Sequence, residues 1–195
     1  MPVFASLKTA CGMAGLRDLT SADLPVILDY WLLSPDEFLA FMGIDRARLG
    51  SADDIRRRFS AAMRTGDSRQ SSIALAITLD ERLIGYTLLN RYSESVNYSH
   101  WHITDAQLRA RGISTALYPH RIKAYFDLVP IARLIHQTRT RNLAVNRMLD
   151  KFIPVSETKY IEKPDGVALP GEFHLRYVTR ADISRFFAVS QAPRS

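Results

Sequence analysis

The segment from Val96 to Arg139 most restricts the fold, because a strand, a helix and a second strand follow one another in it. The side-chain periodicity predicts a strand over Val96–Thr104, a helix over Gly112–Phe126 and a strand over Ala132–Arg139. Two strands joined through a helix should lie parallel, with a right-handed crossover. In open sheets, ligands bind beyond the carboxyl ends of such strands.

The other segments predict antiparallel strands and flanking helices. Ile73–Leu79 and Leu83–Tyr92 flank a turn and predict a hairpin. We expect a mixed, mostly antiparallel α/β sheet with one parallel strand pair and flanking helices, in one domain over residues 14–180. Residues 1–13 are expected to form a tail, and residues 181–195 a short helix or a tail. The remaining predicted elements are a strand at Leu16–Leu19, helices at Leu24–Leu32 and Phe38–Met42 and from Ser51 to Met63, a helix at Asn142–Phe152, and strands at Val155–Ile161 and Phe173–Val178.

Composition restricts the classes of partner. The only cysteine, Cys11, has no intramolecular partner, which favours a reducing, cytoplasmic compartment. No apolar run reaches the roughly 20 residues of a membrane span. The net charge of +6 suits an anionic ligand, and no interleaved aromatic residues or reading helix support a nucleic-acid partner. We expect no membrane partner and no metal.

A basic loop precedes the helix that begins after Gly112. The first backbone N–H groups of a helix have no intrahelical partner, and the helix dipole is positive there, so this helix start can bind an anion. Arg109 and Arg111 add planar donors that suit phosphate. The alternative is a solvated basic turn.

This loop resembles the pyrophosphate loop of the GNAT N-acetyltransferase superfamily, whose signature is Arg/Gln-x-x-Gly-x-Gly/Ala. The element order from about Leu16 to Val178 is also similar to that fold, and the helix opening at Asn142 resembles the family's next helix. The resemblance implies acetyl-CoA as co-substrate. For Asn142 a plain helix N-cap is the competing interpretation. The implied binding residues are Ile103, Thr104, Arg109, Ala110, Arg111, Gly112, Ile113, Ser114, Thr115 and Asn142.

Three positions depart from the family pattern. Many members have Gly where Ala110 stands, and Gly or Ala where Ser114 stands. The family often has a tyrosine that protonates the departing thiolate, and the matching position here is Leu149. That acid is therefore absent or is supplied from elsewhere.

Two histidines are candidates for the base. His100 and His102 lie on one face of the predicted strand, together with Tyr98 and Thr104. Histidine titrates near neutral pH and suits proton removal. Arylalkylamine N-acetyltransferases have a histidine at the spacing of His100 from the loop. The alternatives are a water chain or another residue, with both imidazoles as satisfied polar groups under a helix. The resemblance implies direct attack, with an oxyanion donor among the N–H groups near 103–105.

The resemblance implies acetyl transfer to an acceptor that we expect to be a primary amine of an unidentified small molecule or peptide. The resemblance places Trp31, Asp36 and Glu37 near the acceptor site, although Trp31 at helical spacing is also typical of a core residue. The run 56–58 predicts an exposed helix face. Two other functions compete: a non-catalytic acyl-CoA-binding sensor or partner protein on the same fold, and a nucleic-acid binder that uses the basic helices. Dimers are common in the family, so the resemblance leaves a homodimer open.

Overall fold

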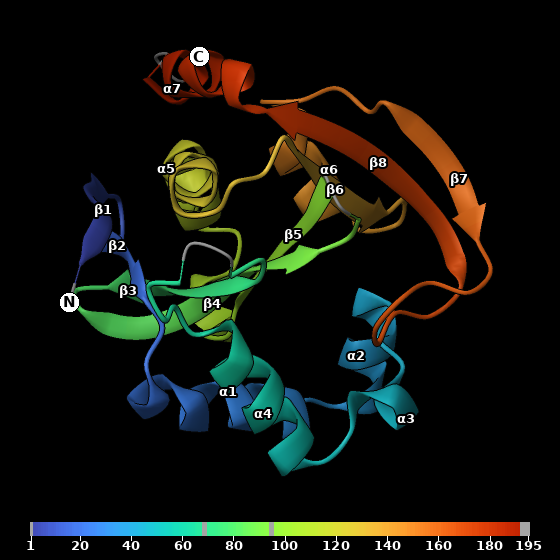
Figure 1. The fold of residues 1–195 in the computed structure, drawn as a ribbon. Coiled ribbons are helices and arrows are strands. Elements are labelled where there is room, and N and C mark those ends of the chain that lie inside the picture. Colours follow the sequence, from blue (N-terminus) through green and yellow to red (C-terminus); the bar gives the residue numbers. More distant parts are fainter. Residues whose placement is uncertain (1, 68–69, 94–95, 192–195) are drawn as a thin grey trace.

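The computed structural model describes residues 2–67, 70–93 and 96–191. Within them an eight-stranded sheet has the order β1-β2-β3-β4-β5-β6-β8-β7 (Figure 1). Neighbouring strands are antiparallel except β5 and β6, which are parallel. This arrangement confirms the predicted fold class. The strands are β1 (Val3–Thr9), β2 (Gly12–Asp18), β3 (Ile73–Leu79), β4 (Arg82–Arg91), β5 (Val96–Ile103), β6 (Arg133–Arg139), β7 (Glu157–Ile161) and β8 (Gly171–Thr179).

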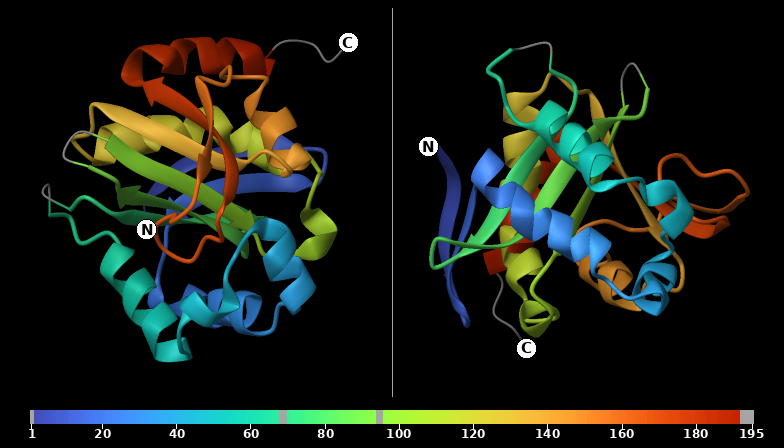
Figure 2. Two further views of the ribbon diagram at one scale, coloured as in Figure 1. Left: turned by 90° about the vertical axis from the view of Figure 1, so that its right-hand side faces the viewer. Right: turned by 90° about the horizontal axis from the view of Figure 1, so that it is seen from below.

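Helices cover both faces of the sheet (Figure 1). One face carries α1 (Leu24–Leu32) and α4 (Ala52–Ala62), which face the viewer in the right panel of Figure 2. The short helices α2 (Asp36–Met42) and α3 (Arg46–Leu49) lie beside them. The opposite face carries α5 (Ile113–Leu128), α6 (Leu143–Leu149) and α7 (Ile183–Gln191). The apolar residues accordingly form separate core clusters on the two faces.

The capping signals in the sequence place the early helices. Ser51 forms a capping box with Asp54 at the start of α4, and Gly43 ends α2 in the left-handed conformation at φ 80°. Thr20 and Asp23 form a second capping box ahead of α1. The short helix α3 was not predicted, because its four residues carry no apolar period of their own.

The segment expected to be an N-terminal tail is instead a strand. β1 pairs with β2 along its length, and the turn between them is closed by a bond from Thr9 Oγ1 to the carbonyl of Gly12 (2.8 Å). Ala5 is buried, and Phe4 and Leu7 pack against the core under α5. The prediction failed because only the four residues 5–8 alternate between apolar and polar, which is the shortest run that indicates a strand, and two successive apolar residues precede them.

The C-terminal segment forms the predicted short helix, α7. Its Phe186 is fully buried and packs against Tyr118 of α5 at a ring-centroid distance of 5.4 Å. This contact holds α7 against α5 on the same face of the sheet. Residues 192–195 of the predicted tail lie outside the described part of the chain.

Candidate active site

The parallel strands β5 and β6 pair briefly and then separate. Their register ends at the pair Tyr98↔Ile135, although β5 continues to Ile103 and β6 to Arg139. Each strand keeps its other neighbour, β4 or β8. The separated strand ends line a cleft of about 2450 Å³. Ordinary ligand pockets measure roughly 300–1,000 Å³, so this cleft has room for an elongated ligand and a second molecule.

Beyond Tyr98, some backbone amides of β5 face this cleft. The Thr104 N–H donates to the Ile84 carbonyl at 2.9 Å. In an antiparallel ladder the residues alternate between facing the partner strand and facing away from it. Even-numbered residues of β5 therefore face β4, and the N–H groups of Trp101 and Ile103 point toward the separated strand β6. Within the described residues these two donors have no strand partner, because the β5–β6 register ends at Tyr98.

The same alternation reduces the number of backbone N–H groups that could act as the predicted oxyanion donor. The N–H groups of Thr104 and Asp105 both point at the Ile84 carbonyl, at 2.9 and 3.5 Å. Within the predicted range 103–105, only Ile103 directs its N–H into the cleft. The Thr104 N–H is therefore already engaged with Ile84, and an oxyanion role for the Ile103 N–H stays a prediction.

Side chains donate hydrogen bonds to cleft-facing carbonyls of β5. His136 Nδ1 lies 3.2 Å from the Ser99 carbonyl, and its Nε2 lies 3.1 Å from the Tyr118 hydroxyl. A carbonyl can only accept, so Nδ1 carries the proton and Nε2 accepts from the tyrosine. Burial, opposed only in part by the bond to Ser99, lowers the pKa of His136 to about 3. The neutral imidazole of His136 thus bridges β5 and α5 just beyond the last backbone pair of β5 and β6.

The loop before α5 has the backbone of an anion site. Ala110 and Gly112 are both left-handed, at φ 59° and 80°, and the helix begins at Ile113. The Ala116 N–H donates to the Gly112 carbonyl at 3.0 Å, so the N–H groups from Ile113 to Thr115 precede the first intrahelical bond. Ile113, Ser114 and Thr115 all line the cleft. A left-handed Ala at position 110 is strained, which fits the glycine common there in the resembling family.

The two loop arginines have different surroundings. Arg109 donates from Nε to the Ile103 carbonyl (3.0 Å) and from Nη2 to the Thr104 carbonyl (3.3 Å). Its guanidinium also lies 4.5 Å from the ring centroid of Phe38 in α2. Arg109 therefore fastens the loop to the end of β5, whereas Arg111 is exposed. Phosphate binding by either side chain stays a prediction.

The predicted histidine pair lies on the cleft wall. The rings of Tyr98, His100 and His102 follow one another at centroid distances of 5.2 and 5.6 Å, as expected for residues on one strand face. Trp31 from α1 packs edge-on against His102 at 4.9 Å, and Tyr86 stacks on it at 5.2 Å. Trp31 is therefore a core residue that also lines the cleft, and its contact with an acceptor stays a prediction.

A tyrosine sets the tautomer of His102. Its Nδ1 lies 3.0 Å from the Tyr30 hydroxyl, which also lies 3.3 Å from the Met42 sulfur. An imidazole nitrogen is a better acceptor than a thioether, so we assign the tyrosine proton to Nδ1. Burial raises the pKa of Tyr30 to about 12, so this proton is retained. His102 Nε2 then carries its own proton and acts as a donor.

Both histidines of the pair are held neutral. Burial and the nearby Arg121 charge lower the pKa of His100 to about 4. Burial, the neighbouring His100 and the Arg109 charge hold the pKa of His102 well below its usual range. The guanidinium of Arg121 is itself buried, with its carbon 3.8 Å from the ring centroid of Trp101. His100 Nδ1 is buried and has no hydrogen-bond partner among the described residues. The role of either histidine as the base stays a prediction.

Helix α6 is anchored by a polar network that the sequence did not reveal. The buried Asn146 donates to the Arg139 carbonyl (2.8 Å) and accepts from Arg176 Nη1 (3.0 Å). Arg176 is fully buried in β8 and pairs with Asp150 at 2.6 Å. Along β8, Arg176 shares its face with Glu172, His174 and Val178, so the sequence pattern gave no signal that it is buried. Asn142 caps α6 by accepting from Val145 N–H at 3.4 Å, so the cap interpretation holds, and its contact with a ligand stays a prediction.

Other residues considered from the sequence lie away from the cleft. Leu149, at the position of the family's tyrosine acid, is fully buried in the core. Asp36 pairs with Arg46 at the surface, and neither Asp36 nor Glu37 lines the cleft. The expected acceptor contacts of these two carboxylates are therefore not present in this arrangement.

The described residues contain no group of three His, Cys, Asp or Glu side chains able to hold a metal ion. A search of the same part of the chain finds no helix that is long and apolar enough to span a membrane.

Comparison with known proteins rests on solved structures. No protein-family model and no curated protein matches the sequence. RimJ from Mycobacterium smegmatis, in complex with CoA-disulfide, superposes with a TM-score of 0.70 over 100% of both chains at 17% identity. The aminoglycoside acetyltransferase AAC(6')-Ib, in complex with coenzyme A and kanamycin, gives 0.64 over 88% of this chain and 98% of its own at 16% identity. A GNAT-family acetyltransferase from Bacillus anthracis gives 0.64 over 91% and 98% at 13% identity.

The chain therefore has the fold of the GNAT acetyltransferases. At these identities the likeness establishes the fold, and function has to be argued from the cleft.

Proposed function

We propose that this protein is an N-acetyltransferase that transfers an acetyl group from acetyl-CoA directly to a primary amine of a small molecule or peptide. The observation that carries the proposal is the separation of β5 and β6, which directs unpaired N–H groups of Trp101 and Ile103 into a cleft leading to the start of α5. Coenzyme A in RimJ and AAC(6')-Ib supports the same co-substrate here.

The backbone of the cleft suits a thioester ligand with a phosphate-bearing end. The N–H groups from Ile113 to Thr115 can receive a pyrophosphate, and the Ser114 hydroxyl adds a donor. The cleft-facing amides of β5 can pair with the amides of an extended pantetheine arm. We assign cofactor contact to these groups, to the loop 109–112 and to Asn142, which lines the same cleft.

We assign different roles in the reaction to His100 and His102. The ammonium group of the acceptor first loses one proton to solvent. The neutral amine nitrogen then attacks the thioester carbon, and the oxygen that gains charge accepts from Ile103 N–H or His102 Nε2. The attacking nitrogen loses its proton toward His100, directly or through water, once bond formation has acidified it. The carbon–sulfur bond then breaks. A thiol has a pKa near 8.5, so the sulfur can leave as thiolate and take a proton from solvent without an acid at Leu149.

A non-catalytic acyl-CoA-binding protein is the second candidate. The buried Leu149 at the acid position favours it. It differs from the first proposal in one respect, since it predicts cofactor binding without amine-dependent release of CoA.

Amine-dependent release of the CoA thiol from acetyl-CoA tests the proposal. We expect turnover with a panel of primary amines, and a loss of about 10²-fold or more in kcat for His100→Gln at unchanged acetyl-CoA affinity by calorimetry. His174→Gln is the matched control, because His174 bonds Thr158 outside the cleft. Binding without turnover across the panel would establish the second candidate, and absence of acetyl-CoA binding by folded protein would refute both.

A further inference from the structure

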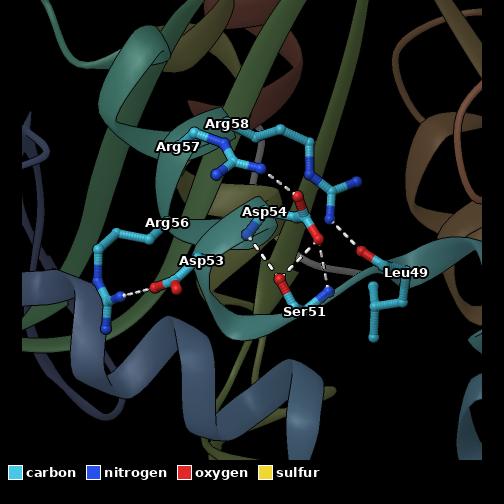
Figure 3. A network of polar contacts seen from close by, with 7 residues as sticks. All are labelled: Leu49, Ser51, Asp53, Asp54, Arg56, Arg57 and Arg58. Carbon is cyan, nitrogen blue, oxygen red and sulfur yellow. Dashed lines mark hydrogen bonds and ion pairs between the residues drawn. The ribbon is translucent and has the colours of Figure 1, made fainter.

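The arginines of α4 each have an oxygen acceptor (Figure 3). Arg56 and Arg57 pair with the aspartate three residues earlier, and Arg58 donates to the Leu49 carbonyl. All three residues are exposed, which confirms the predicted exposed helix face. The fully buried Arg176 likewise has a carboxylate partner. These guanidinium groups are therefore satisfied by neighbouring oxygens, whether they are exposed or buried.

Arg121, in the middle of α5, lacks such an acceptor. It is 2% exposed, and it forms no ion pair with any described residue. Its Nε and Nη2 atoms are buried and have no hydrogen-bond partner in the described part of the chain. Burial lowers the pKa of Arg121 only to about 10, so the group is charged at neutral pH. A buried charge without a partner lowers the stability of a fold, so its presence calls for another explanation.

The groups packed around Arg121 supply no negative charge at neutral pH. Its guanidinium carbon lies 3.8 Å from the ring centroid of Trp101 and 5.1 Å from that of Tyr118. Burial raises the pKa of Tyr118 well above its usual range and that of Tyr125 to about 12, so both phenols stay protonated. Among the described residues, the faces of aromatic rings are what offsets this charge.

Arg121 lies on the α5 side of the point where β5 and β6 separate. Trp101, which covers it, belongs to the part of β5 that no longer pairs with β6, and it lines the cleft. The charge of Arg121 acts on the neutral His100 of β5 and the neutral His136 of β6, on the two sides of this point. The start of α5 follows the end of β5, so a ligand with its pyrophosphate there extends back along β5. Its thioester then lies in front of Trp101.

We propose that Arg121 is a positioning residue for the departing sulfur, and that its guanidinium, held behind Trp101, stabilises the thiolate of CoA. When the carbon–sulfur bond breaks, its electron pair stays on sulfur and the acetyl group stays on the amine nitrogen. The thiolate then takes a proton from solvent. A fixed charge in a site that excludes water needs no reorganisation at that moment. Arg121 itself touches no reacting atom.

The inference rests on the proposed acetyl transfer and explains how the sulfur leaves without an acid at Leu149. The charge of Arg121 opposes protonation of His100, so its benefit falls on the departing sulfur and not on the base. The residue thus offsets a loss of stability with an effect on one step of the reaction.

The pKa of the thiol of bound CoA measures this effect directly. Cys11 is the only cysteine, so in a Cys11→Ser background the CoA thiol is the only thiol in the sample. Its ionisation is followed by the ultraviolet absorbance of the thiolate over a pH series, with protein in excess and protein without CoA as the blank. We expect the bound thiol to titrate about one pH unit below free CoA. Bound CoA that titrates at or above free CoA overturns the inference, and this result needs no substitution at Arg121.

Two substitutions separate charge from packing. Arg121→Met keeps the length of the side chain and removes its charge. We expect it to return the bound thiol close to the pKa of free CoA and to lower kcat about tenfold. The free energy of unfolding should stay the same or rise, because an unpaired buried charge is gone. Arg121→Lys keeps the charge and should keep the lowered thiol pKa.

Lys123→Met is the control, because Lys123 is exposed on the same helix and pairs with Asp127. It should change neither the thiol pKa nor kcat. A methionine variant at position 121 that loses stability and kcat while the thiol pKa stays at the wild-type value would assign Arg121 a structural role and contradict the inference. Equal effects at positions 121 and 123 would contradict it as well.

Calorimetric titration of acetyl-CoA and of CoA separates the two levels of failure. If both bind and amines are acetylated, but the bound thiol titrates like free CoA, the proposed function stands and the inference is wrong. If neither binds to the folded wild-type protein, the proposed function itself has failed.

Discussion

The chemistry of the candidate site depends on which protons two histidines carry. His102 Nδ1 is hydrogen-bonded to the Tyr30 hydroxyl, whereas the buried His100 Nδ1 has no partner in the described part of the chain. The sequence placed both histidines on one strand face and distinguished them only by the resemblance of the spacing of His100. Their contacts separate a hydrogen-bond donor from a proton acceptor, and this division underlies the proposed mechanism.

The lowered histidine pKa values predict a stability that depends on pH. His100 has a pKa of about 4 in the folded protein against 6.5 as the ordinary value, so the unfolded chain binds more protons between these limits. Stability is complete above about pH 6.5 and is lost as the pH falls toward 4. Urea unfolding should show that His100→Gln loses about 2 kcal/mol less than the wild type between pH 7 and pH 5.

His136 contributes to the same loss, with a window that extends to about pH 3, so the variant should keep part of the slope. Superimposable pH profiles of wild type and variant would show that His100 is not held neutral in the fold.

At the scale of elements, the site depends on how α6 is attached. The helix is short, and isolated helices of this length are not stable in water. Its position is set by Asn146 and by Arg176, which reaches it from β8. This network therefore holds Asn142, at the start of the helix, against the cleft.

Arg176→Met tests this attachment. We expect a loss of about 2 kcal/mol in the free energy of unfolding, because Asn146 and Asp150 lose a buried charged donor, and a weaker affinity for acetyl-CoA. The control is Arg56→Met, which removes an exposed pair with Asp53 and should cost less than about 0.5 kcal/mol. Equal losses in urea unfolding at the two positions would mean that the network contributes little.

At the scale of the molecule, the succession of elements was predictable from residue patterns. The βαβ unit at 96–139 fixed the parallel pair, and the signals at Ser51 and Gly43 fixed helix ends. Strand β1 was missed because only four of its residues, 5–8, alternate. It is stabilised by pairing with β2 and packing under α5. The conformation of such a segment depends on tertiary packing, which the local residue pattern does not show.

The site was predictable to a similar degree. The loop before α5 and the histidine pair follow from local sequence, because they are close together in the chain. The direction of Arg109, the proton of His102 and the role of Arg176 depend on contacts with α2, α1 and α6. Residues so distant in sequence show no spacing that relates them.

The central claim is that acetyl-CoA occupies the separation of β5 and β6 and the start of α5. Hydrogen–deuterium exchange with and without saturating acetyl-CoA tests it most directly. The account predicts slower exchange at Trp101, Ile103 and the amides from Ile113 to Thr115, with little change at Thr104, which already donates to Ile84. Saturable binding that protects other amides and leaves these unchanged would contradict the account.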